Sequence, residues 1–349
     1  MLATALSPGA ALHQRCGALT TGERRSRQRR AHCFRAATAS GEGAEAQADA
    51  LNKQHGIRGS VAFLAGPGGL VRAVLSHANG TSAEVHLHGA TVTSFAQSSG
   101  DEVLYIRPDA KFDGSKPIAG GIPICFPRFG PSPEMQQHGF ARNLPWSVLR
   151  TSADLRPDDP EPCVQLRLKD DETTRAMWPH AFDALYEVTL RRDKLRLLFQ
   201  VKNNNTDGQP FDFTCALHTY LEVVDAALPT VKVTGLKGCT YLDKVPDPKS
   251  PVRKTETNDA VTFGTALVDR MYLDTPTEVL LEVGTGAAVA VEHLSGWSDT
   301  VTWNPHTTLP ECWTNFVCVE SAKTQPVTLQ AGYVWEAEMT LAVIDLPTE

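Results

Sequence analysis

Two residues suited to acid–base chemistry lie in otherwise apolar segments of the chain. His218 lies within the segment Ala216–Leu221, and Glu320 ends the segment Phe316–Glu320. Burying an unpaired carboxylate costs several kcal/mol, so an acid in such a place is generally paired or functional. A His and a Glu on separate strands can converge in a cleft, where they form the minimum set for acid–base work on a hydroxyl. The alternative interpretation of His218 is a buried core residue whose ring is hydrogen-bonded.

A second group of polar residues reads Gln137-His-Gly-Phe-Ala-Arg-Asn143. Four hydrogen-bonding side chains fall within these seven residues. In an extended segment, His138 and Arg142 are four residues apart and therefore share one face. A solvated loop has the same composition, so the spacing alone leaves both interpretations open.

The stretch Asp113–Pro131 combines several Pro and Gly residues with a few apolar ones. Proline removes a backbone donor and glycine weakens a strand, so a central strand is excluded and a shaped loop is predicted. Lys116 and Arg128 lie within this loop. The loop is therefore either a structural turn or an anion-facing element.

The elements around these residues are predicted to be strands. Leu70–Leu75 and Ala83–His88 flank Asn79-Gly80, a strong hairpin signal, and Ala184–Leu190 with Leu195–Val201 suggest a second hairpin. Other runs rich in β-branched and aromatic residues add strands; they are Phe211–Val223, Ala287–Glu292, Phe316–Val319 and Val334–Val343. Helical signals are few and short, the best being Asp171–Met177. The pattern predicts an all-β, antiparallel sandwich rather than a parallel α/β sheet.

The first fifty residues differ from the rest of the 349-residue chain. The first 35 contain seven Arg and one acid, Glu23, and no secretory apolar core is present. Residues 1–50 are therefore expected to be a disordered, cleaved organellar transit peptide, with the chloroplast as destination and the mitochondrion or cytoplasm as alternatives. A basic tail that binds an anion is the other interpretation. Residues 51–349 are expected to form one domain.

Composition excludes several classes of function. The residues after position 35 carry a net charge of −13, which disfavours general binding to nucleic acid. No apolar run is long enough to span a bilayer, so no membrane partner is expected. The eight Cys lie singly, without a metal-binding spacing, and no Gly-rich phosphate loop occurs. Neither a metal nor another cofactor is expected, and the protein is expected to be a monomer.

Six motifs occur in order along the chain. They are Asp113-Gly-Ser-Lys-Pro-Ile-Ala-Gly-Gly-Ile-Pro-Ile-Cys-Phe-Pro127, Gln137-His-Gly-Phe-Ala-Arg-Asn143, Trp178-Pro-His-Ala-Phe182, Leu217-His-Thr-Tyr220, Asp299-Thr-Val-Thr-Trp-Asn-Pro305 and Val317-Cys-Val-Glu320. Together they resemble the hexose-6-phosphate branch of the aldose 1-epimerase (galactose mutarotase-like) superfamily. The resemblance covers nearly all of residues 51–349 and implies an enzyme with a large antiparallel β-supersandwich and few short helices.

The resemblance also implies roles for individual residues. His218 corresponds to the catalytic acid and Glu320 to the catalytic base. The remaining matches are contacts to a hexose 6-phosphate, and these are Gln137, Arg142 and Asp243, with His138 orienting the sugar ring. The implied reaction interconverts the α and β anomers. An epimerase of unphosphorylated aldoses and a non-catalytic sugar-phosphate binding module are the alternatives.

One position departs from the family pattern. Ala119 stands where the family commonly has an Arg before Gly120-Gly121. Arg128 lies nine residues further along the same loop, and its planar fork suits a phosphate. We hypothesise that Arg128, with Arg142 and Lys116, completes the phosphate site. The alternative is that Arg128 faces solvent.

Overall fold

Antiparallel strands make up most of the computed structural model, which describes residues 41–154 and 159–347. The strands form three sheets, and every pairing between them is antiparallel. The prediction of an all-β antiparallel architecture is confirmed. Among the described residues, no helix is long and apolar enough to cross a membrane.

The four-stranded sheet has the order β1-β2-β3-β4, and the eight-stranded sheet has the order β14-β13-β16-β19-β20-β10-β5, with β11 paired to β20. The strands of the first sheet are β1 (Val61–Ala65), β2 (Val71–Ser76), β3 (Ser82–His86) and β4 (Thr91–Ala96). Those of the second are β5 (Ile124–Cys125), β10 (Phe211–Leu217), β11 (Tyr220–Glu222), β13 (Thr240–Asp243), β14 (Val252–Thr255), β16 (Val268–Leu273), β19 (Asp299–Asn304) and β20 (Phe316–Leu329).

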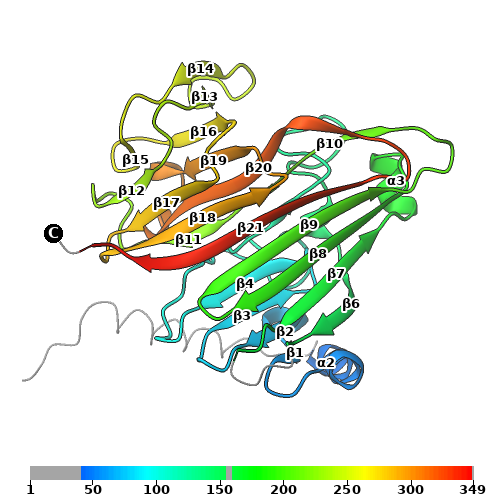
Figure 1. The fold of residues 1–349 in the computed structure, drawn as a ribbon. Coiled ribbons are helices and arrows are strands. Elements are labelled where there is room, and N and C mark those ends of the chain that lie inside the picture. Colours follow the sequence, from blue (N-terminus) through cyan, green and yellow to red (C-terminus); the bar gives the residue numbers. More distant parts are fainter. Residues whose placement is uncertain (1–40, 155–158, 348–349) are drawn as a thin grey trace, which may run out of the picture. The chain divides into compact units, whose positions relative to one another are not determined.

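The nine-stranded sheet has the order β15-β12-β17-β18-β21-β9-β8-β7-β6 and is the largest. Figure 1 shows β6 to β9 and β21 as long neighbouring arrows, and β7 and β8 contact β2 while β8 also contacts β3. Its strands are β6 (Ser147–Ser152), β7 (Cys163–Lys169), β8 (Phe182–Arg191), β9 (Lys194–Asn203), β12 (Val231–Thr234), β15 (Ala260–Thr262), β17 (Glu278–Val283), β18 (Ala287–Ser295) and β21 (Val334–Asp345).

Both predicted hairpins are present. β2 and β3 pair across a turn in which Gly80 has a φ of 97°, a conformation that glycine adopts without strain. β8 and β9 pair from Phe182↔Asn203 to Arg191↔Lys194. In both cases a period-two pattern and a turn signal were enough to predict the pairing.

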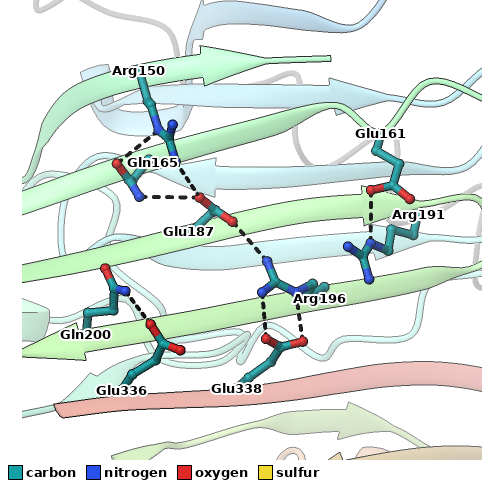
Figure 2. Close-up of polar contacts among 9 residues, drawn as sticks. All are labelled: Arg150, Glu161, Gln165, Glu187, Arg191, Arg196, Gln200, Glu336 and Glu338. Atoms are coloured by element: carbon teal, nitrogen blue, oxygen red, sulfur yellow. Dashed lines mark hydrogen bonds and ion pairs between the residues drawn. The ribbon is translucent and has the colours of Figure 1, made fainter. Parts of the chain in front are cut away.

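The hydrophobic core lies between the inner faces of the sheets. On β9, alternate residues are buried, so Leu197 and Phe199 enter the core while Arg196 faces outward. The outward side chains of β6 to β9 and β21 form a ladder of ion pairs and hydrogen bonds instead of an apolar face (Figure 2). Arg196, for example, bonds both Glu187 and Glu338. Over these strands the largest sheet therefore has one apolar face and one polar face.

Two α-helices are found in the described part of the chain. α3 (Glu172–Met177) matches the predicted Asp171–Met177, and the Asp171 carboxylate accepts a 2.8 Å hydrogen bond from the Thr174 backbone N–H. Short 3-10 turns complete the elements, and they are η1 (Pro67–Gly69), η2 (Ala141–Asn143), η3 (His306–Thr308) and η4 (Trp313–Asn315).

The second helix, α2 (Gly41–His55), corrects the boundary of the predicted transit peptide. Residues 41–50 were expected to be disordered, but Ala44 and Ala48 are buried against the core. The Asn52 side chain also bonds both the N–H and the carbonyl of Phe63 on β1, each at 2.7 Å. A composition rich in Ala is shared by transit peptides and helices, which is why residues 41–50 were grouped with the leader. Residues 1–40 lie outside the described residues.

Candidate active site

His218 and Glu320 face each other from neighbouring strands. β10 pairs with β20 up to Leu217↔Ser321, and one further step in the same register sets His218 opposite Glu320. His218 Nδ1 lies 3.3 Å from Glu320 Oε1, and the two side chains are 10% and 2% exposed. The backbone N–H of His218 donates to the carbonyl of Pro123 at 3.0 Å. The two strands thus bring the predicted acid and base into contact.

The pair lies on the face of the eight-stranded sheet that is turned away from the main core. Val317 and Val319 of β20 belong to the main core, so the alternate residues Cys318 and Glu320 face the other side. Two small apolar clusters border the pair on this face, which we call the site face. One consists of Cys125, Ala216, Val301 and Ala322, and the other of Tyr105, Tyr220, Cys312, Phe316 and Cys318.

Aromatic rings hold the imidazole of His218 in place. The Tyr220 ring stacks on it, with centroids 4.7 Å apart and an interplanar angle of 14°. Trp303 meets it edge-on at 5.9 Å, and the His138 ring lies 5.6 Å away. Packing on several sides leaves the ring few alternative rotamers, so its nitrogens have fixed directions.

Burial governs the protonation of the pair. It raises the pKa of Glu320 well above its ordinary value, and the charge of Asp269 acts in the same direction while Lys244 and Arg142 oppose it. Burial also lowers the pKa of His218 well below its ordinary value, aided by His138, Arg142 and Lys244. Both groups are therefore pushed towards their neutral forms, in which the carboxyl of Glu320 keeps its proton and the imidazole of His218 carries no charge.

The segment from Gln137 to Arg142 reaches the pair, but not as an extended strand. His138 and Gly139 have φ values of 67° and 73°, and Ala141–Asn143 form the 3-10 turn η2. A Cβ on Gly139 would lie 2.1 Å from the Phe126 carbonyl oxygen, so glycine is required at this close approach. The extended interpretation is therefore wrong.

Two of the three predicted residues of this segment, His138 and Arg142, nevertheless lie near enough to the pair to influence its charge. His138 Nδ1 accepts a 3.2 Å hydrogen bond from the Gly130 N–H, and burial, with Arg142 and Lys244, lowers the pKa of His138 to about 3. The guanidinium of Arg142 donates to the Gln137 carbonyl at 2.9 Å, and its charge reaches both His218 and Glu320. Its Nε is buried without a hydrogen-bond partner. Gln137 itself is exposed, with its side-chain amide 3.1 Å from His138 Nε2.

The Asp113–Pro131 stretch forms the predicted shaped loop, apart from the two-residue strand β5. Gly121, with a φ of 67°, approaches the Val92 carbonyl so closely that a Cβ would lie 2.1 Å from its oxygen. Lys116 is exposed, and its carbonyl accepts a hydrogen bond from His88. Arg128 is half-buried and makes no ion pair or side-chain hydrogen bond with the described residues. The phosphate role of these two cations stays a prediction.

Asp243 is not brought to the pair. The pairing register across β13, β16, β19 and β20 places Leu242 in the same cross-strand row as Glu320. Asp243 is the next residue along β13, so its side chain faces the other side of the sheet. Its carboxylate bonds Lys254 Nζ at 2.6 Å and the Val245 N–H at 3.1 Å. The prediction that Asp243 contacts the substrate is therefore not supported by its position, because side chains alternate between faces.

The neighbouring Lys244 is the residue that the sequence interpretation missed. Lys244 lies on the site face, and its Nζ is 3.2 Å from Asp269. Asp269 pairs with Trp303 on β19, and Trp303 pairs with Cys318 on β20, so this row adjoins the row of Glu320. The sequence offered only a weak signal for Lys244, which is that it directly follows Asp243, the residue named as a substrate contact. Among residues 41–154 and 159–347, no group of three or more His, Cys, Asp or Glu is arranged to hold a metal.

Comparisons with known proteins agree with this geometry. A family model described as aldose 1-epimerase matches residues 72–342. A protein of Cenchrus ciliaris is 36% identical over 290 residues, which is 80% of this chain and 86% of the relative. A protein of Escherichia coli K12 is 32% identical over 257 residues, covering 69% and 81%. Both carry the name "Putative glucose-6-phosphate 1-epimerase".

Solved structures show the same fold. The crystal structure of a "putative mutarotase (YeaD)" from Salmonella typhimurium has a TM-score of 0.73 and 28% identity, covering 83% of this chain and 96% of that one. Galactose 1-epimerase from Lactobacillus acidophilus has a TM-score of 0.62 at 14% identity, covering 80% and 95%, and so supports the fold alone. The expected galactose mutarotase-like supersandwich is confirmed. With the family model matching most of its length, the chain belongs to the aldose 1-epimerase family.

Proposed function

We propose that the protein is a mutarotase that interconverts the α and β anomers of glucose 6-phosphate. The observation that carries the proposal is the 3.3 Å contact between His218 and Glu320 on the site face. The names of the relatives from Cenchrus ciliaris and Escherichia coli support the phosphorylated substrate. An acid and a base in contact are what opening and closing a hemiacetal requires.

The reaction needs one proton removed and one delivered. In its ionised form, Glu320 takes the proton of the anomeric hydroxyl, while protonated His218 gives a proton to the ring oxygen. The bond between C1 and the ring oxygen breaks, and C1 becomes an aldehyde. Rotation about the C1–C2 bond presents the other carbonyl face, and the two groups return the protons in reverse. Atoms and charges balance because each group ends in its starting state.

The proton shared by the pair supports this scheme. The His218–Glu320 pair contains the same number of protons in two distributions. In one, the His is neutral and the carboxyl is protonated; in the other, the His is charged and the carboxyl is ionised. Bound sugar hydroxyls and nearby charges decide which distribution is populated. The 3.3 Å approach of His218 Nδ1 to Glu320 Oε1 keeps the two groups close enough for the charge of one to influence the other.

Arg142 and Lys244 supply positive charge beside the pair. We propose that they hold the anionic substrate through charge-assisted hydrogen bonds, with His138 and Gln137 contacting the ring hydroxyls. Fixing the sugar between acid and base lowers the entropy cost of the reaction.

The decisive experiment is polarimetry of freshly dissolved α-glucose 6-phosphate, run beside α-glucose. Acceleration with the phosphate ester in clear preference to glucose supports the proposal. Equal or better acceleration with glucose would identify an epimerase of unphosphorylated aldoses. Binding of glucose 6-phosphate without acceleration would leave a sugar-phosphate binding module.

We further propose that the enzyme acts as a monomer without nucleic acid, and that its basic N-terminal residues direct it to the chloroplast. The seven Arg in the first 35 residues support the second statement. Light scattering of the purified protein tests the first.

A further inference from the structure

Arg107 is a third cation of the site face, and none of the sequence motifs contains it. Ile106 and Gly120 form an antiparallel bridge, and the Arg107 N–H donates to the Ala119 carbonyl at 3.0 Å. Arg107 is therefore directly opposite Ala119. Side chains opposite each other in an antiparallel pair lie on one face with Cβ atoms about 5 Å apart. The Arg107 side chain thus begins beside Ala119, whose own side chain is a single methyl group.

The direction in which the Arg107 side chain points can be inferred from the side chain of Tyr105, two residues earlier on the same extended segment. The Tyr105 N–H donates to the Tyr220 carbonyl at 2.9 Å, and the Tyr105 ring packs with Phe316 and Cys318 on the site face. Because residues two apart in an extended segment point the same way, Arg107 points to that face too.

Electrostatics agree with this placement. Burial raises the pKa of Tyr220 well above its ordinary value, and the charge of Arg107 opposes that rise. Tyr220 is the ring that stacks on His218. Arg107 therefore borders the site rather than open solvent.

The present partner of Arg107 is an exposed carboxylate. Its Nε and Nη2 donate to the two oxygens of Asp109 at 2.9 and 2.7 Å, and the side chains of Arg107 and Asp109 are 18% and 56% exposed. A planar guanidinium that binds a carboxylate through two parallel bonds can bind a phosphate in the same way. Because the Asp109 side chain is more than half exposed, a phosphate that arrives from solvent can compete with it for the guanidinium.

We propose that Arg107, rather than Arg128, contacts the 6-phosphate of the substrate, and that Asp109 holds its guanidinium until the phosphate arrives. This inference rests on the proposed function and names the residue that gives it phosphate specificity. Arg107 reaches from the segment opposite Ala119 into the space that an arginine at position 119 would use.

The test compares kcat/KM for glucose 6-phosphate and for glucose. Arg107→Ala should lower the value for glucose 6-phosphate at least about tenfold, and that for glucose less than about twofold. Asp109→Asn should lower KM for the phosphate ester about two- to fivefold, because the competing carboxylate loses its charge. Arg128→Ala should change neither substrate by more than about twofold.

Arg196 offers a matched control. Its side chain is 17% exposed and forms two hydrogen bonds with the carboxylate of Glu338, but it lies on the outer face of the nine-stranded sheet (Figure 2). Arg196→Ala should leave both kcat/KM values unchanged. A second variant, Arg107→Ala with Ala119→Arg, restores a guanidinium from the facing position and should recover most of the lost activity.

Equal loss on both substrates in Arg107→Ala, or a phosphate-specific loss in Arg128→Ala alone, would overturn the inference. Failure of the proposed function looks different, because the unaltered protein would then show no preference for glucose 6-phosphate over glucose. In that case stabilisation against heat by inorganic phosphate still tests Arg107. Phosphate should raise the Tm of the unaltered protein and of Arg196→Ala, and an equal rise in Arg107→Ala would reject the site.

Discussion

His218 Nδ1 lies 3.3 Å from Glu320 Oε1 because the register of β10 and β20 continues for one residue beyond the end of β10. The relationship depends on backbone pairing rather than on long, flexible side chains. Packing by Tyr220 and Trp303 then fixes the imidazole. The acid and base are thus positioned before any substrate arrives.

Removing either member of the pair should abolish most of the catalysis. His218→Ala and Glu320→Gln each lose the transfer of one proton, which is worth roughly 10²- to 10⁴-fold in rate. Since the two groups act as a unit, the double variant should be little slower than either single one. Polarimetric kcat on glucose 6-phosphate measures this, with circular dichroism to verify folding. Near-normal turnover in both single variants would show that the assignment is wrong.

Lys244 and Asp269 should move the pH profile of kcat in opposite directions. Burial first, and then Asp269, raise the pKa of Glu320, whereas Lys244 lowers it. Asp269→Asn should therefore move the limb of the profile that reports the ionisation of Glu320 to lower pH. Lys244→Met should move the same limb to higher pH. The shift is measured by kcat between acid and alkaline pH with saturating substrate. Parallel shifts in the two variants would contradict the opposing roles.

The protein should lose stability as the pH falls below the ordinary pKa of histidine. Burial, with the charges of Arg72 and His88, lowers the pKa of His86 from 6.5 to about 3. The folded state keeps His86 neutral while the unfolded chain takes up a proton, so stability is fully present above about pH 6.5 and declines towards pH 3. At pH 5 this group should cost about 2 kcal/mol.

Urea unfolding at pH 7 and pH 5 measures that loss. His86→Gln should reduce the difference between the two pH values by about 2 kcal/mol, although the variant is less stable at both. His55→Gln, at the less buried end of α2, serves as the comparison. An unchanged pH difference in His86→Gln would contradict the expected linkage.

The N-terminal segment should act as an address. A fusion of residues 1–40 to a fluorescent reporter is expected to enter the chloroplast of a plant cell, because the segment is basic and lacks an apolar signal core. The same segment with Arg24, Arg25 and Arg27 changed to Glu should remain in the cytosol. Cytosolic fluorescence from the unaltered fusion would refute the address.

The sequence predicted those features of the fold that depend on local pattern. The β2–β3 and β8–β9 hairpins followed from alternation and turn residues, and α3 matches the best of the few helical signals. The break at His218-Thr219 between β10 and β11 was not foreseen, since the apolar pattern runs through it. That break is the point at which His218 leaves the hydrogen-bond ladder.

The site was predictable only in part, because its members come from strands far apart in sequence. His218 and Glu320 were singled out as polar residues in apolar strands, and their contact needed the sheet order to be known. Asp243 was named as a substrate contact and Lys244 was not considered, but alternation from β13 onward gives the site face to the lysine. Arg107 carried no motif at all, because its proximity to Ala119 depends on an isolated bridge.

Under the proposed import into the chloroplast, the helix α2 would limit where a maturation protease could cut. Its first turns carry Ala44 and Ala48, which are buried, and Asn52 ties its last turns to the backbone of β1. A cut at the composition boundary near Ala50 would divide the helix and strip apolar cover from the four-stranded sheet. An enzyme that matures after import should therefore keep an N-terminus upstream of Gly41, and a preparation trimmed to residue 51 should aggregate on warming where one trimmed to residue 41 does not.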